Sequence, residues 1–388
     1  MGSYFLLMGV LQAYVPFRAS HLGADGAVLG VLLLLSGGGI GLVTDLGLAA
    51  YADARGREQV VVAGFGCALG AVFLVVLDNS IAALYIGCFL FGLGNSAIFD
   101  PLLALLTTTA HHHSQARTQG FNVSVQRTGA LLAAVMIGIT LASGHDDILA
   151  LTAGLACLVP MIVVYLRTPR SRRLVLKPPR SGPPGALPLL RDGYRLGLKM
   201  FLRRRIVMAA LVSVAVNLIF IETNSFVPLI DTHHGLREAV EVSAALGARD
   251  IVAIAVGVFV VATGKDASSS KMVVSALCLA AVSAAGVGLG VNGPHSVLIL
   301  CCGLQGVAIG VGVAAMNLLT VGSSSDEHRA VAMAAATLIN RVGVIVIPIG
   351  LGLSLQLAGL RSVFLVIGAT LALFGVAFFA AGIRPERS

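Results

Sequence analysis

The sequence predicts an all-α membrane protein with twelve transmembrane helices in two pseudo-symmetric six-helix bundles. Three observations predict this fold class: an apolar composition, twelve apolar runs of membrane-spanning length, and a repeat between the two halves of the chain. Of the 388 residues, 57% are hydrophobic and only 11% are charged, whereas soluble domains carry about 25% charged residues. So few charges cannot cover the surface of a soluble core, and so much apolar surface excludes disorder.

Twelve apolar runs are separated by charged residues, prolines and glycine clusters. A helix needs roughly 20 apolar residues to cross a bilayer, and lipid offers no partner to backbone groups that are not paired within a helix. We therefore interpret the runs as transmembrane helices. They span 3–19, 26–50, 59–77, 82–107, 120–142, 148–166, 206–230, 238–263, 272–290, 296–320, 329–353 and 357–382. The first run lacks the basic start and cleavage site of a signal peptide, so we expect it to be retained.

The distribution of Lys and Arg sets the orientation. With both termini in the cytoplasm, twenty of the 26 basic residues fall in cytoplasmic segments and three in outer loops. This asymmetry follows the positive-inside rule and accounts for the net charge of +8 without a nucleic acid partner. Together with the abundance of Ala, Gly and Val, it favours a multi-pass protein of the bacterial cytoplasmic (inner) membrane, whose basic loops face anionic lipid.

A basic, proline-rich segment divides the chain. Residues 167–205 hold twelve basic residues and six prolines, which predicts a cytoplasmic linker between an N-terminal bundle (1–166) and a C-terminal bundle (206–388). The end of this linker alternates apolar residues (Leu190, Tyr194) with Arg191 and Arg195 at helical spacing. We expect an amphipathic helix there, lying on the membrane surface.

The two halves repeat each other at an offset of 212 to 214 residues. The segments VPFRASHLG (15–23) and VPLIDTHHG (227–235) match, as do QRTG (126–129) and NRVG (340–343). Asp53 and Asp266 occupy equivalent places after the second helix of each half. Parallel repeats of this kind are typical of one class of secondary transporters.

Twelve helices in two halves around a basic linker resemble the major facilitator superfamily, in particular its drug and metabolite exporters. The loop after the second helix reads AAYADARGREQV (49–60), and Asp53, Gly56 and Arg57 match the family's motif in that loop. The second copy, ATGKDASSSK (262–271), keeps Asp266 and Lys271. A tight turn needs Gly56, which tolerates positive φ. The resemblance implies that these residues close a cytoplasmic gate; the alternative is a basic anchor loop.

Ionisable residues within membrane-spanning runs are candidates for function. Asp45, Asp100 and Arg127 all fall toward the cytoplasmic ends of their helices in the first half. They could form one ion-paired cluster that supports the gate. Alternatively, Asp45 and Asp100 lie near enough to the interface to be hydrated.

Glu222 is the candidate for binding substrate or proton. It lies in LIFIETNSFVPL (218–229) on the seventh helix, flanked by Asn217 and Asn224, which are seven residues apart and share a helical face. A carboxyl buried in a low dielectric can take up and release a proton near neutral pH. The alternative is a structural hydrogen bond between helices.

Arg249 and Asp250 are adjacent on the eighth helix, so their side chains leave it about 100° apart. We expect them to pair poorly with each other. Arg341, on the eleventh helix, could instead neutralise Asp250. Arg127 and Arg341 occupy equivalent repeat positions. They either share a structural role or bind an anionic substrate.

The function that these features predict is secondary active transport of a small organic solute by alternating access, coupled to protons and directed outward. The alternative is a proton-coupled importer or facilitator of an organic anion. No P-loop sequence, metal-ligand spacing or clustered nucleophile and base is present. We therefore expect no cofactor, no metal and no enzymatic activity. The expected partners are the solute, protons and membrane lipid, and we expect the protein to be a monomer.

Overall fold

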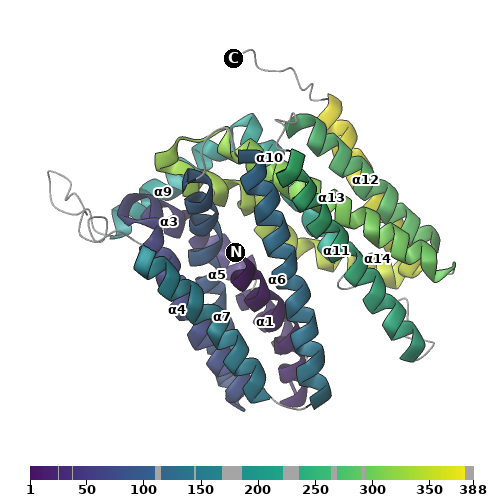
Figure 1. Ribbon diagram of the computed structural model, residues 1–388, viewed down its shortest axis with the longest axis horizontal. Helices are drawn as coiled ribbons and strands as arrows, with labels where there is room; N and C mark the ends of the chain where they lie inside the picture. The colour runs from purple at the N-terminus through teal and green to yellow at the C-terminus, as the bar shows by residue number, and fades with distance from the viewer. Residues whose placement is uncertain are drawn as a thin grey trace. The chain divides into compact units, whose positions relative to one another are not determined.

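The computed structural model describes residues 1–24, 26–36, 38–109, 115–143, 146–167, 186–221, 236–263, 269–290 and 293–380, which are almost entirely helical (Figure 1). The N-terminal half contains α1 (Gly2–His21), α2 (Gly26–Ser36), α3 (Gly38–Arg55), α4 (Arg57–Leu77), α5 (Ile81–Thr109), α6 (Gln115–Ser143) and α7 (Asp146–Arg167). The rest contains α9 (Ala186–Phe201), α10 (Arg204–Ile221), α11 (Leu236–Thr263), α12 (Ser269–Gly290), α13 (His295–Val321), the short 3₁₀ helix η4 (Asp326–His328) and α14 (Arg329–Ala380).

Wherever the structure describes the twelve predicted runs, they are helical; the run 206–230 is described as far as Ile221. The run 26–50 is covered by two consecutive helices, α2 and α3, and the last two runs both fall on α14. Gly359, with φ of 77°, breaks the helical geometry of α14 and separates its two halves. Among the described residues, nine segments are long and apolar enough to cross a membrane. Helices α1, α6 and α10 lie at predicted positions but are not among those nine.

The chain forms two compact units, each assembled from both halves of the sequence. Unit 1 comprises Met1–Ala110, Thr128–Arg203 and Ser323–Val342; unit 2 comprises His111–Arg127, Arg204–Gly322 and Gly343–Ser388. The second segment of unit 2 starts at Arg204, near the end of the predicted linker. Two short segments are exchanged between the halves: the start of α6 belongs to unit 2, and the start of α14 belongs to unit 1.

Unit 1 is built around α3, α4 and α5. Helix α4 packs along both α5 and α7, and α3 packs against α5 and α9 (Figure 1). Small residues allow close approach: a Cβ placed on Gly193 of α9 would lie 2.2 Å from the Cβ of Ala50 on α3. Close helix contact through small residues is typical of membrane proteins, in which packing replaces the hydrophobic drive between helices.

Unit 2 is built around α13. This helix packs against α10, α11 and α12. Gly306 of α13 lies so close to α11 that an added Cβ would approach the carbonyl oxygen of Arg249 to 2.2 Å. The start of α6 packs against α11 in the same way, through Gly120 and Gly257.

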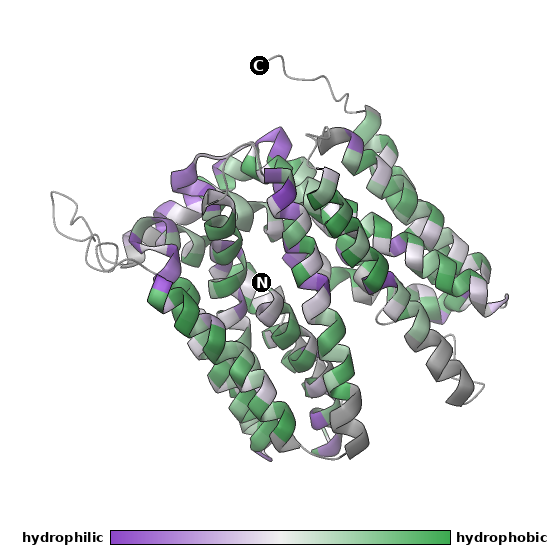
Figure 2. Cartoon of the chain, in the orientation of Figure 1, coloured by the Kyte–Doolittle hydropathy of each residue, from purple (hydrophilic) through white to green (hydrophobic). Residues whose placement is uncertain are grey.

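Helix α7 shows the pattern of a helix that faces lipid. Its exposed side carries large apolar residues, including Leu151, Leu155 and Val159, whereas its buried side carries the small residues Ala153 and Cys157. A soluble helix has the opposite arrangement, with polar residues outside. Helices α4 and α7 are accordingly hydrophobic along most of their length (Figure 2). The structure is therefore that of an all-helical, multi-pass membrane protein, as the sequence predicts.

Candidate functional site

The turn between α3 and α4 brings two of the predicted gate residues together. Gly56 alone separates the helices, and its φ of 123° is a conformation that favours glycine, as the sequence predicts. The turn places Asp53, in the last turn of α3, beside Arg57, the first residue of α4. Nη2 of Arg57 lies 2.7 Å from Oδ1 of Asp53, and Nε of Arg57 donates to the same oxygen at 2.8 Å.

Asp53 also holds the start of α14. The backbone amide of Ala330 donates to Oδ1 of Asp53 at 3.3 Å, and that of Val331 donates to Oδ2 at 3.1 Å. Arg57 reaches the same segment through the backbone carbonyl of Asp326. The first amides of a helix have no intrahelical acceptor and carry partial positive charge, so a carboxylate stabilises this end. We call Asp53, Arg57, Asp326, Ala330 and Val331 the latch.

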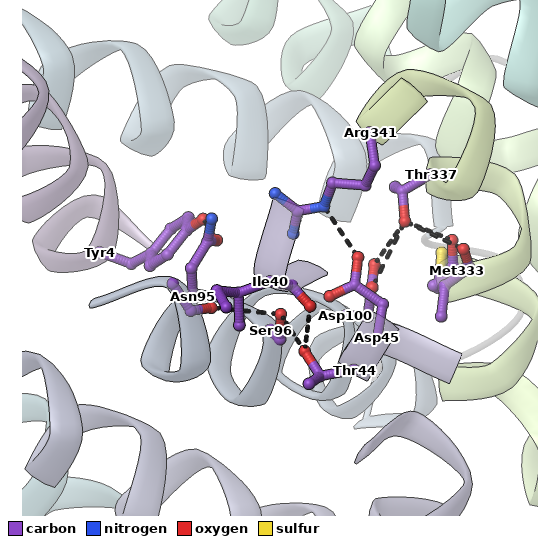
Figure 3. A network of polar contacts seen from close by, with 12 residues as sticks. Tyr4, Ile40, Thr44, Asp45, Asn95, Ser96, Asp100, Met333, Thr337 and Arg341 are labelled. Atoms are coloured by element: carbon purple, nitrogen blue, oxygen red, sulfur yellow. Dashed lines mark hydrogen bonds and ion pairs between the residues drawn. The ribbon is translucent and has the colours of Figure 1, made fainter. Parts of the chain in front are cut away.

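A second charged group lies farther along α3 and α14 and includes a residue of α5. Asp45 of α3 and Asp100 of α5 are both fully buried, and Arg341 of α14 is nearly so. Nε of Arg341 donates to Oδ2 of Asp45 at 2.8 Å (Figure 3). The hydroxyl of Thr337, one turn before Arg341, lies 3.4 and 3.5 Å from the two oxygens of Asp100. We call Asp45, Asp100 and Arg341 the triad.

Uncharged polar side chains flank the triad. The hydroxyl of Tyr4 on α1 donates to the amide oxygen of Asn95 on α5, and the hydroxyl of Thr44 donates to that of Ser96 at 3.0 Å (Figure 3). Asn95 and Ser96 precede Asp100 by about one turn, and Thr44 adjoins Asp45. The sequence analysis missed this network, because single Asn, Ser and Thr residues in a membrane helix give no distinguishing pattern.

Unit 2 contains a separate charged cluster. Asp250 of α11 accepts hydrogen bonds from Nε and Nη2 of Arg249 at 3.1 and 3.0 Å, and Nη1 of Arg127 on α6 lies 3.7 Å from Oδ1 of Asp250. All three residues are buried. This cluster brings two guanidinium groups to one carboxylate, whereas the triad brings one guanidinium group to two carboxyls.

Hydrogen bonds hold the start of α6 against the other helices of unit 2. The amide of Asn317 on α13 donates to Oε1 of Gln119 at 2.8 Å. The hydroxyl of Ser124 donates to the backbone carbonyl of Ile254 on α11 at 3.1 Å. Helical spacing places Gln119, Asn122 and Gln126 along one face of α6, and all are buried. This spacing was visible in the sequence and was overlooked.

The predicted cluster of Asp45, Asp100 and Arg127 is wrong. Asp45 pairs with Arg341, and Arg127 instead lies against Asp250. The reason is the exchange of segments: Arg127 lies in the part of α6 that belongs to unit 2, and Arg341 lies in the part of α14 that belongs to unit 1. Asp45 and Asp100 are also fully buried, which contradicts the alternative that they are hydrated at the interface.

The expected partners of Arg249 and Asp250 are also wrong. These neighbours pair through two hydrogen bonds, because the long arginine side chain folds back along the helix and overcomes the angle between their Cβ directions. Arg341 is held by Asp45 and is not the residue that neutralises Asp250.

The remaining predicted residues belong to unit 2 or lie outside the described residues. Asn217 lies near the end of α10, and Lys271 is exposed in the first turn of α12. Glu222, Asn224 and Asp266 lie outside the described residues.

Comparisons with known proteins agree with this architecture. The family model described as Major Facilitator Superfamily matches residues 1–285. No curated protein matches the chain.

Two solved structures have the same fold. The proton:xylose symporter XylE, bound to 6-bromo-6-deoxy-D-glucose, is 14% identical with a TM-score of 0.73, covering 98% of this chain and 94% of that chain. The human organic anion transporter MFSD10 (TETRAN) is 15% identical with a TM-score of 0.67, covering 97% of each chain. At such identities these structures show the fold alone. Because the family model covers most of its length, the chain belongs to the Major Facilitator Superfamily.

Proposed function

We propose that this member of the superfamily is a secondary active transporter that exports a small organic solute by alternating access, coupled to protons. In this mechanism two bundles rock about a central site, so that contacts at one side of the membrane break while those at the other form. The chain should act as a monomer in a bacterial inner membrane, with both termini in the cytoplasm.

The latch is the observation that carries this proposal. It joins α3, the second predicted span of the first half, to the start of α14, the eleventh predicted span. Its contacts are hydrogen bonds and one ion pair, which water can replace when they separate. A hydrogen bond contributes about 0.5–1.5 kcal/mol net, and one to a charged group about 1.5–3 kcal/mol. A few such bonds suit a gate that closes firmly and still opens by thermal motion.

Outward direction and the proton-binding role of Glu222 come from the sequence. The likeness to exporters favours efflux, and the carboxyl of Glu222 in an apolar helix suits proton exchange. Asn217 and Asn224 would offer hydrogen bonds to the solute from the same helix.

One observation favours the second candidate function, transport of an organic anion. Arg127, Arg249 and Asp250 gather two guanidinium groups and one carboxylate in the buried part of unit 2. Guanidinium groups bind carboxylates and phosphates through paired hydrogen bonds. A structural neighbour is described as an organic anion transporter, which makes this class worth testing directly.

The test is transport by the purified protein in inverted proteoliposomes with an imposed pH gradient. A pH-sensitive dye inside reports proton movement while amphipathic cations, neutral drugs and organic anions are added in turn. The proposal predicts a proton flux that depends on one of these solutes and is lost in Glu222→Gln. Uptake of an anion without proton movement would favour the second function. Proton flux that is unchanged in Glu222→Gln would remove Glu222 from the coupling mechanism.

A further inference from the structure

We propose that the triad of Asp45, Asp100 and Arg341 is a proton-binding site of the transporter, in addition to or in place of Glu222. The inference rests on the proposed proton coupling and names residues that would carry it. Three helices supply the site: α3, α5 and the start of α14. All three lie in unit 1, so the geometry is that of one compact body.

The carboxyl oxygens of the triad receive few hydrogen bonds. Oδ2 of Asp45 accepts one from Arg341, but Oδ1 of Asp45 is buried with no hydrogen-bond partner among the described residues. Asp100 is approached by the hydroxyl of Thr337, at the long distances of 3.4 and 3.5 Å. A buried carboxylate is stable only when its oxygens are supplied with donors or paired with cations. A proton bound to either carboxyl supplies a donor where one is lacking.

The net charge of the triad also favours a bound proton. The charged and titratable groups that face it are Tyr4 of α1, Tyr194 of α9 and the three triad residues themselves. Among the described residues, Arg341 is the one cation in this group, so two ionised carboxyls would leave a surplus negative charge inside the membrane. Binding one proton leaves a neutral set, which is the arrangement that a low dielectric favours.

Asp250 provides a matched contrast. It is also a buried aspartate in a membrane helix, but Arg249 and Arg127 both lie within 4 Å of it. Two guanidinium groups therefore lie beside this single carboxyl. The two clusters therefore place similar side chains in opposite charge environments, and only the triad has a carboxyl in excess.

The triad and the latch share helices α3 and α14. Asp45 precedes Asp53 on α3 by eight residues, about 12 Å at 1.5 Å per residue. Arg341 follows Val331 on α14, and Thr108 of α5, one of the groups that Arg57 contacts, follows Asp100. Proton binding changes the charge that α3 and α5 present to α14, and α14 begins at the latch. Uptake and release of the proton thereby bias the contact that the latch closes.

The experiment is an infrared difference titration of the purified full-length protein in liposomes, without solute, so that the probe is the proton alone. The carbonyl stretch of protonated carboxyl groups is followed well above about pH 4, where exposed carboxyls titrate. Wild type should show a band that grows as the pH falls. Asp100→Asn or Asp45→Asn should remove or strongly displace this band, while the matched variant Asp250→Asn should leave it unchanged.

The proposal is overturned if the band is the same in wild type, Asp100→Asn and Asp45→Asn, or if Asp250→Asn or Glu222→Gln abolishes it. Should the aspartate variants fail to fold, Thr337→Val keeps both carboxyls and removes the hydroxyl that lies beside Asp100. The same hydroxyl also bonds to the backbone carbonyls of Met333 and Ala334 within α14. Its loss next to Asp100 should shift the titration of the band, and no shift would count against the triad. If the carbonyl band depends on Asp45 and Asp100 but no solute drives a proton flux, the proposed coupling is refuted and the proton-binding site is retained.

Discussion

Gly41 gives the sharpest test of the packing that positions the triad. A Cβ placed on Gly41 would lie 2.6 Å from Nε and 2.8 Å from Cζ of Arg341. Both distances are too short for real atoms, so Gly41→Ala must displace the guanidinium group. Nε is the atom that donates to Asp45 at 2.8 Å, so the displacement removes the hydrogen bond of a buried ion pair.

The magnitude follows from the burial of that pair. The substitution keeps Arg341 beside Asp45 and removes the hydrogen bond between them, and a hydrogen bond to a charged group contributes about 1.5–3 kcal/mol. The replacement of a helical glycine by alanine returns about 0.5–1 kcal/mol, so the net loss should be about 0.5–2.5 kcal/mol. For a unit of roughly 200 residues, 1 kcal/mol corresponds to about 2–4 °C in Tm. We therefore expect Gly41→Ala to lower the Tm by at least about 1 °C.

The assay uses the protein's own cysteines. Cys88, Cys157 and Cys302 are fully buried, so a thiol-reactive dye reports unfolding in detergent as the temperature rises. Gly66→Ala is the matched control, because Gly66 is also in a helix and an added Cβ would meet no atom within 4 Å. A Tm of Gly41→Ala equal to or above that of Gly66→Ala would refute the assigned position of Arg341.

Three further predictions concern the latch and the helix contacts. Asp53→Asn loses the ion pair and weakens the bonds to the start of α14. Alkylation of a cysteine introduced at the start of α14 should therefore accelerate, and an unchanged alkylation rate would contradict the latch. Ser124→Ala removes the bond to the carbonyl of Ile254 and should cost about 0.5–1.5 kcal/mol, seen as a lower Tm; an unaltered Tm would argue against that contact. Gly193→Ala should detach α9 from α3 and speed trypsin cleavage after the exposed Arg191, whereas Leu198→Ala, on the exposed face of α9, should not.

The helices could be predicted from the sequence because each is encoded locally. A run of about 20 apolar residues in lipid pairs its backbone groups by forming a helix, and the described parts of the predicted runs are helical. The turn at Gly56 was also predictable, since a one-residue connection requires a backbone conformation that glycine tolerates.

The pairing of charges could not be predicted in the same way. Asp45 and Arg341 are separated by 296 residues, and their contact depends on which segments of the two halves pack together. The repeat placed Arg127 and Arg341 at equivalent positions, and the structure gives each an aspartate on a helix from the other half of the sequence. This reciprocity was present in the repeat and could have been predicted had the second and fifth helices of opposite halves been assumed to meet.

Alternating access requires the latch to open in every transport cycle, and a disulfide across it tests this requirement most directly. Asp53→Cys combined with Ala330→Cys places thiols at two positions that the latch brings together, where the backbone amide of Ala330 donates to Oδ1 of Asp53 at 3.3 Å. The two single variants are controls for the native cysteines. We predict that oxidation of the double variant abolishes solute-dependent proton flux in proteoliposomes and that reduction restores it. Flux that continues at the same rate in the cross-linked protein would contradict the claim that the latch opens during transport.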